Sequence, residues 1–223
     1  MQYLRVAPTT MLQQTRKVQI FIICLSFLAG FIDALGYMSM GGMFVSFMSG
    51  NTTRLGVELS HPFTAATLLP GVIILCFVAG VFTGSSVGRR YHQVRQPVLL
   101  GIMTLILVTV ASLATHMAPV WLLLLLTFTM GMENTLFQSS EISIGLTYMT
   151  GTLVRMAQHF SEAVFSRWNW DWARYALLWM GLMAGALSGT WCYRWLHFSA
   201  VWVPAAIAMG LWVTSVAYLR KTT

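Results

Sequence analysis

Six long apolar segments alternate with polar stretches along this chain. They cover residues 18–38, 65–88, 98–115, 119–139, 172–193 and 199–219. The hydrocarbon core of a bilayer is about 30 Å thick, and an α-helix crosses it with roughly 20 apolar residues. Each of the six segments is therefore predicted to be a transmembrane helix.

Two further stretches, 39–61 and 140–166, mix apolar residues with Gly, Ser, Asn, Thr and Arg. They are too polar for ordinary membrane-spanning helices. Backbone that leaves helical geometry at membrane depth must be buried in protein or line a water-filled cavity. We therefore predict that both stretches are re-entrant or interrupted helices.

The two halves of the chain repeat one pattern in one register. Adding 101 to a residue number finds its counterpart, as in Gly30 and Gly131, Met48 and Met149, Gly50 and Gly151, Arg54 and Arg155, and the rows Gly80, Gly84, Gly88 and Gly181, Gly185, Gly189. This duplication divides the chain into a cytoplasmic N-terminal tail (1–17) and two membrane repeats (18–117 and 118–223) that form one membrane domain.

The number of crossings sets the relation between the repeats. Three spans and one re-entrant segment give an odd number of crossings in each half, so the second half enters the membrane with the opposite orientation. Inverted repeats of this kind bring their broken helices together near the bilayer midplane. If 39–61 and 140–166 cross fully instead, the chain has eight spans and the repeats are parallel.

Composition agrees with this fold class. Hydrophobic residues make up 57% of the chain and charged residues 9%, which excludes a soluble surface. We expect an all-α polytopic membrane protein whose surroundings are the lipid bilayer. The three cysteines fall inside spans without metal-ligand or disulfide spacing, so no metal or other cofactor is expected. The sequence also contains no phosphate-binding loop or nucleophile elbow.

The net charge of +7 is concentrated at the ends of the spans. In a six-span arrangement nearly all Lys and Arg residues lie on one side, whereas eight spans would put the Arg89–Arg95 cluster opposite Lys17. This pattern disfavours a nucleic-acid partner. By the positive-inside rule it places both termini in the cytoplasm.

A family resemblance rests on paired motifs. The first half contains Gly30-Phe31-Ile32-Asp33-Ala34 and Phe47-Met48-Ser49-Gly50-Asn51-Thr52-Thr53-Arg54-Leu55-Gly56, and the second half contains Gly131-Met132-Glu133-Asn134 and Met149-Thr150-Gly151-Thr152. These motifs resemble the YoaK-like family of bacterial membrane proteins, a domain of unknown function. The resemblance covers nearly the whole chain and implies a multi-pass protein of the bacterial inner (plasma) membrane. It supplies no substrate, and the family tends to have Gln in place of Glu133.

Asp33 lies near the end of an apolar span, where a charge costs about 2.5–3.5 kcal/mol on insertion scales. An Arg or a proton must compensate for this cost. We predict proton or ion coupling through Asp33, Glu133 and Asn134, the last being the repeat partner of Asp33. The alternative is a structural ion pair that holds the repeats together.

The repeat-related Arg54 and Arg155 each follow a Gly-centred break by one helical turn. A guanidinium offers a planar fork for a carboxylate or phosphate, so both are predicted to bind substrate. Pairing with Glu58, four residues after Arg54, or snorkelling to the interface are the alternatives. Amide and hydroxyl groups near the breaks are predicted to assist, although they could equally serve freed backbone groups: Asn51, Thr52 and Thr152.

The breaks are predicted to begin short helices. Ser49 and Thr150 would cap helices that start at Gly50 and Gly151, leaving a positive dipole end for a polar or anionic group. The glycine rows are predicted to be helix-packing faces, either within one chain or across a homodimer.

These features favour a small-molecule transporter that moves a polar or anionic solute through a site between inverted repeats, with proton coupling through Asp33 as one form of this function. An intramembrane enzyme or lipid-handling protein is the alternative, with Asp33 and Glu133 as acid–base groups. We expect these two carboxylates on opposite sides, which disfavours an enzyme. A non-catalytic membrane scaffold is the third possibility.

Overall fold

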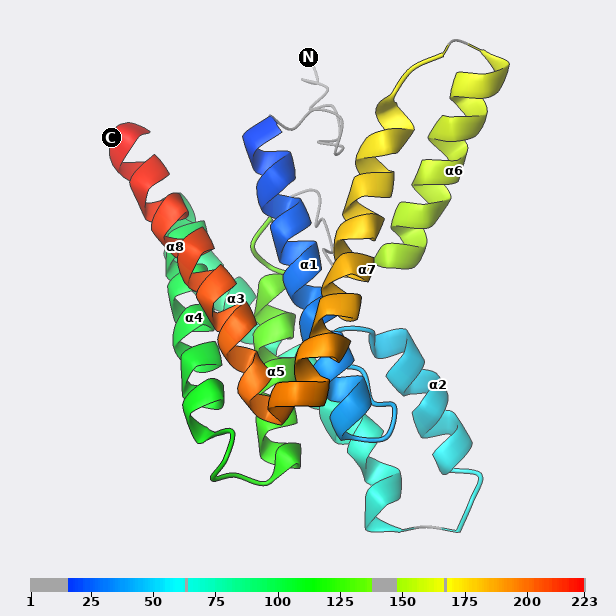
Figure 1. Ribbon diagram of the computed structural model, residues 1–223, viewed down its shortest axis with the longest axis vertical. Coiled ribbons are helices and arrows are strands. Elements are labelled where there is room, and N and C mark those ends of the chain that lie inside the picture. Colours follow the sequence, from blue (N-terminus) through cyan, green and yellow to red (C-terminus); the bar gives the residue numbers. More distant parts are fainter. Residues whose placement is uncertain (1–15, 63, 138–147, 167, 223) are drawn as a thin grey trace, which may run out of the picture.

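The computed structural model of the protein describes residues 16–62, 64–137, 148–166 and 168–222 (Figure 1). These residues form α-helices and short 3-10 helices and contain no strand. The α-helices are α1 (Arg16–Ser39), α2 (Met48–Glu58), α3 (Leu69–Arg90), α4 (Arg95–Leu113), α5 (Pro119–Glu133), α6 (Met149–Phe165), α7 (Asp171–Leu196) and α8 (Trp202–Thr222). The 3-10 helices are η2 (Ala65–Leu68), η3 (His92–Val94) and η4 (His197–Val201).

Four helical stretches are long and apolar enough to cross a membrane. They are Val18–Ser39, Leu69–Arg90, His92–Leu113 and Asp171–Leu219, and the last contains both α7 and α8. The all-α membrane class predicted from the sequence is therefore confirmed.

The predicted span 119–139 is too long, because α5 ends at Glu133. The chain then makes two successive turns, in which Thr135 N–H donates to Met132 O and Leu136 N–H donates to Glu133 O. The Thr135 hydroxyl also donates to Met132 O at 2.7 Å, so it competes with the helical pattern at this point. With 15 residues, α5 measures about 22 Å and ends well inside the bundle.

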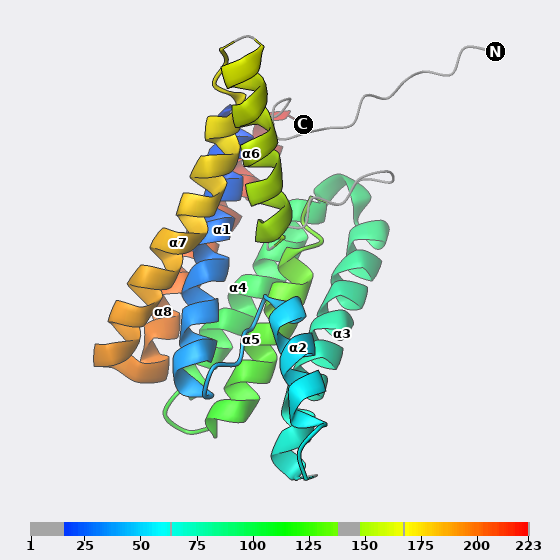
Figure 2. The same cartoon turned by 90° about the vertical axis from the view of Figure 1, so that its right-hand side faces the viewer.

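Helices at corresponding places in the two halves run in opposite directions (Figure 1). α1 runs from the upper end of the molecule to the lower end and α5 runs upward; α3 and α7, and α4 and α8, are related in the same way. α1 begins and α8 ends at the same end of the bundle. The short helices α2 and α6 begin near the middle and run toward opposite ends (Figures 1 and 2).

Close helix pairs join the two halves. α1 packs along α7, and α3 packs along α5. Glycines permit the approach: a Cβ added at Gly30 would overlap the Leu182 carbonyl of α7, and one added at Gly131 would overlap the Phe77 carbonyl of α3. The glycine rows are thus packing faces within one chain, with one exception. Gly88, the last member of its row, lies beneath the guanidinium of Arg95 rather than against another helix backbone.

Candidate functional site

The two breaks meet in one pocket. A cavity of about 280 Å³ lies where α2 and α6 begin. Its lining consists of Ser46, Phe47, Met48 and Ser49 from the first break, Tyr148, Met149 and Thr150 from the second, and Phe77 and Asn134 from the paired helices α3 and α5. The structure thus brings together the repeat-related segments that the duplication predicted to meet. The lining offers hydroxyl and amide groups among aromatic rings and thioethers.

Asp33 of α1 holds the first break in place. The buried N–H groups of Val45 and Ser46 both donate to Asp33 Oδ1 at 2.7 Å, and the Ser46 hydroxyl donates to Asp33 Oδ2 at 2.5 Å. The freed backbone of the break therefore finds its partners in this carboxylate. Among the described residues, neither Arg54 nor Arg155 forms an ion pair with it, and the compensation expected for Asp33 comes from these donors instead.

Asn51 of α2 braces the same break from the other side. Its side chain is fully buried. Its Oδ1 accepts a hydrogen bond from Phe44 N–H at 3.1 Å, and its Nδ2 donates to Phe44 O at 2.7 Å. The amide thus satisfies both backbone groups of one extended residue. The chain between α1 and α2 is fixed by two side chains that the sequence had singled out.

Glu133 is the unusual group of the site. It lies at the end of α5 with no exposed surface, and neither carboxylate oxygen has a hydrogen-bond partner among the residues that the structure describes. It also lies within electrostatic range of Asp33. The two carboxylates, which the sequence predicted on opposite sides, therefore lie within reach of each other's charge.

The remaining polar groups of the prediction bond mainly to local backbone. The Thr52 hydroxyl donates to Met48 O at 2.9 Å, and the Thr152 hydroxyl donates to Tyr148 O at 3.3 Å. Asn134 donates from Nδ2 to Met130 O at 2.9 Å and also lines the pocket. Substrate contact by Thr52 and Thr152 stays a prediction, and neither residue lines the described pocket.

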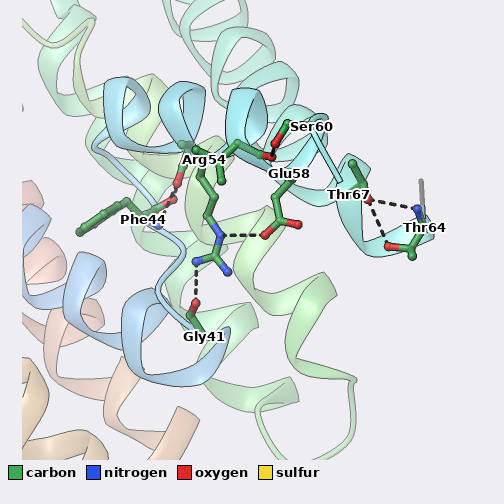
Figure 3. Close-up of polar contacts among 9 residues, drawn as sticks. Gly41, Phe44, Arg54, Glu58, Ser60, Thr64 and Thr67 are labelled. Carbon is green, nitrogen blue, oxygen red and sulfur yellow. Dashed lines mark hydrogen bonds and ion pairs between the residues drawn. The ribbon is translucent and has the colours of Figure 1, made fainter. Parts of the chain in front are cut away.

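The two arginines lie away from the pocket. Arg54 Nη1 donates to Gly41 O at 2.5 Å, and its Nε lies 3.8 Å from a carboxylate oxygen of Glu58 (Figure 3). Gly41 belongs to a tight turn after α1 in which it and Gly42 have positive φ. Arg155 is exposed on α6. A carboxylate clamp at these two residues stays a prediction that the pocket's lining does not support.

This arrangement makes the two contacts of Arg54 separable. The Glu58→Gln change should hardly alter the thermal midpoint in detergent, since a half-exposed i,i+4 pair contributes about 0.3–0.5 kcal/mol. Arg54→Gln should cost about 1 kcal/mol more, because it also leaves Gly41 O without its charged donor. Size-exclusion profiles after heating would measure both variants. Equal effects would show that the bond to Gly41 contributes nothing.

The predicted caps are corrected by the structure. α2 and α6 begin at Met48 and Met149, so the N-cap residues are Phe47 and Tyr148, and neither helix has a side-chain cap. Ser49 and Thr150 lie in the first turn instead. A second feature explains the glycines: a Cβ at Gly50 would overlap the ring of Phe47, and a Cβ at Gly151 would overlap the ring of Tyr148.

Sequence reasoning missed these two aromatic residues. Each folds its ring over the glycine three residues later, at the mouth of the same pocket. Their signal was present, because Phe47 and Tyr148 are related by the 101-residue repeat and precede matched Met and Gly residues. The preference for polar N-cap residues pointed to Ser49 and Thr150 instead.

The fold and the shared pocket define a multi-pass transmembrane protein built from two halves. The family model described as "Protein of unknown function (DUF1275)" matches residues 21–214. The chain belongs to this family, which confirms the resemblance found in its motifs.

Two bacterial relatives match this chain over most of their lengths. The chain is 34% identical to the UPF0700 transmembrane protein RA0705 of Rhizobium meliloti (strain 1021), over 85% of this chain and 82% of the relative. It is 25% identical to the UPF0700 transmembrane protein YoaK of Bacillus subtilis (strain 168), over 90% and 94% respectively. No solved structure matches the chain.

Proposed function

We propose that this protein is a small-molecule transporter of the bacterial inner membrane, with its solute site in the pocket between the two breaks. One observation carries the proposal: repeat-related segments from both halves line a single pocket, and its lining residue Asn134 directly follows Glu133, which is buried without a hydrogen-bond partner among the described residues. Duplicated transporters place their sites at such a junction of discontinuous helices. A scaffold would gain nothing from an unsatisfied carboxylate in its core, since such a group is costly to bury.

The proposed topology has six spans in two inverted repeats of three, with α2 and α6 as re-entrant helices. The opposite directions of α1 and α5, α3 and α7, and α4 and α8 support it (Figure 1). The starts of α2 and α6 near the middle of the bundle would then lie near the midplane. The common end at which α1 begins and α8 ends carries Arg89, Arg90 and Arg95, and it would face the cytoplasm.

The solute that fits best is small and polar rather than anionic. The pocket's described lining contains serine, threonine, asparagine and tyrosine side chains but no basic residue. The carboxylate of Asp33, which accepts hydrogen bonds from the lining residue Ser46, would repel an anion. Of the predicted coupling residues, Glu133 is the best proton carrier, since both Asp33 oxygens already accept hydrogen bonds from the first break. Asn134 would contact the solute.

Flux into proteoliposomes tests this function. A panel of neutral, cationic and anionic metabolites would be screened with and without a pH gradient. The wild-type protein should accumulate a polar solute in response to the gradient. Glu133→Gln should remove this response, because an amide cannot carry the proton.

Glu58→Gln is the matched control, as it makes the same chemical change at a half-exposed carboxylate outside the pocket. It should transport as the wild type does. A Glu133→Gln protein that keeps both its flux and its response to pH would rule out coupling through Glu133. The proposed homodimer is a separate matter, to be measured by the mass of the detergent-solubilised protein.

A further inference from the structure

Glycines set the register of the α3–α5 pair. A Cβ at Gly80 would overlap the backbone of Phe128, and a Cβ at Gly84 would press on the backbone of Met132. The Sγ–H of Cys76 donates to Leu124 O at 3.1 Å, one turn earlier. The two helices thus run parallel, and each step of four residues along α3 matches a step of four along α5.

The α1–α7 pair is its repeat counterpart, but its register differs. Here Gly185 packs on the backbone of Phe27 and Gly189 on that of Phe31. Phe27 is the counterpart of Phe128, whereas Gly185 is the counterpart of Gly84 rather than Gly80. The Phe128 backbone thus meets the first glycine of its row, Gly80, whereas the equivalent Phe27 backbone meets the second glycine of the other row, Gly185. The two pairs differ by four residues, which is one helical turn or about 6 Å along the axis.

The contacts of the two glycines on α1 and α5 show the same offset. Gly30 lies between Leu182 and Ala186 of α7, and Gly131 lies between Phe77 and Val81 of α3. Under the repeat, Phe77 and Val81 correspond to 178 and 182. Gly30 therefore again sits four residues further along its partner helix than Gly131 does.

The last glycine of each row shows where the offset leaves space. Gly189 is packed against Phe31 and Ala34, whereas the atoms nearest to its counterpart Gly88 belong to the Arg95 guanidinium. A cavity of about 1140 Å³ lies beside Gly88, at the end of the bundle where α3 ends and α4 begins. Its walls include Leu136 and Leu211.

The equivalent place at the opposite end is filled. The repeat counterparts of Phe21, Leu136 and Leu211 in the cavity wall are Leu122, Leu35 and Val110. All three counterparts have no exposed surface and belong to one core cluster. Among the residues that the structure describes, Phe21 and Leu211 of the cavity wall are thus partly exposed, whereas their counterparts Leu122 and Val110 are fully buried.

We propose that the two glycine-lined pairs exchange registers, and that this exchange is how the proposed transporter alternates its access. The inference rests on the proposed function. α5 slides one turn along α3 toward Gly88 and displaces Arg95, so that the end of α5 enters the cavity. At the same time the α1–α7 pair takes the register now seen in α3–α5, which opens the packed end. The glycines along both pairs leave no bulky side chains that would obstruct the slide. One-turn shifts of packed elements are a known mode of conformational switching.

Spin labels can measure the exchange directly. With Cys24, Cys76 and Cys192 replaced by alanine, one protein carries labels at 90 and 121 and a second at 20 and 191. These repeat-related positions are all exposed. In the observed registers they are separated along the axes by about 25 Å and about 20 Å. The exchange shortens the first distance by about 6 Å and lengthens the second by about 6 Å. Labels at 20 and 37, both on α1, should stay fixed.

Two matched alanine variants shift the balance in opposite directions. A Cβ in Gly88→Ala meets the end of the Arg95 side chain first now, but would strike the Met132 backbone after the slide, so this variant should leave only the observed distances. Gly80→Ala overlaps the carbonyl oxygen of Phe128 now, whereas a Cβ at its counterpart Gly181 in the other register lies 3.1 Å from the carbonyl oxygen of Ile23, so Gly80→Ala should enrich the exchanged distances.

The wild-type protein should show both distances for each labelled pair. A single distance in the wild type would overturn the proposal if Gly80→Ala does not move it or does not fold. Shifts of the same sign in both pairs would also overturn it, since they indicate rigid rocking. The measurement needs no solute. If the protein exchanges registers but transports no solute, the register exchange stands and the transport proposal fails. If it transports a solute without exchanging registers, the transport proposal stands and the register exchange fails.

Discussion

Replacing Gly185 by alanine should lower the thermal midpoint of the detergent-solubilised protein more than any other single methyl addition in the glycine rows. The added Cβ would overlap the carbonyl oxygen of Phe27, and backbone cannot swing aside as a side chain can. Overpacking of this kind costs about 1–3 kcal/mol, and here a long helix pair must separate to relieve it. The exchange of registers would not relieve this overlap, because it would bring Gly185 against the backbone of Phe31.

Gly210→Ala on α8 is the matched control. Nothing lies within 4 Å of a Cβ built at Gly210, and alanine favours a helix interior over glycine by about 1 kcal/mol. This variant should therefore be as stable as the wild type or slightly more stable. Heating followed by size-exclusion chromatography would compare the two. Equal midpoints for Gly185→Ala and Gly210→Ala would show that α1 and α7 are not held as closely as the structure indicates.

The second large effect is expected at the two carboxylates, with opposite signs. Asp33→Ala should destabilise the protein by about 2 kcal/mol or more, because it leaves the buried N–H groups of Val45 and Ser46 without an acceptor. Glu133→Gln should leave stability unchanged or raise it, since it removes a buried acid that has no bonded partner among the described residues. Both variants would be heated under the same conditions.

Ser46→Ala separates the contributions at Asp33. It removes only the hydroxyl donor to Oδ2 and should cost about 1 kcal/mol, less than Asp33→Ala. If Asp33→Ala were as stable as the wild type, the carboxylate would not be the support of the first break. Asp33 would then be the stronger candidate for coupling, and Glu133 the weaker one.

Most of the architecture could be predicted from the sequence, because the architecture depends on patterns that extend over long stretches of the chain. Hydrophobic length located the helices to within a few residues, and the 101-residue repeat paired the breaks and the glycine rows. Six spans and inverted repeats are the proposed topology, which the helix directions support. The meeting of the breaks at one pocket followed from the duplication alone, since it needed no knowledge of side-chain contacts.

What the sequence could not predict depends on short-range competition. The end of α5 at Glu133 arises from a threonine that bonds locally, and a hydropathy pattern does not register one hydroxyl. Arg54 was expected at a solute and instead reaches Gly41, whose carbonyl is presented by a turn with positive φ. Phe47 and Tyr148 act as N-caps in place of Ser49 and Thr150 because their rings fold over a glycine, a preference that capping statistics for polar residues do not include.

The pairing of α1 with α7 and of α3 with α5 has a consequence for biogenesis. Each half contributes one helix to each pair, so neither half contains a complete glycine-lined interface. During synthesis α1 enters the membrane some 150 residues before the Gly181–Gly189 row of α7 has been made. The insertion machinery or surrounding lipid must shield α1 over this interval. The ancestral single-repeat protein, before its gene was duplicated, would have needed a second copy in the opposite orientation to complete either interface.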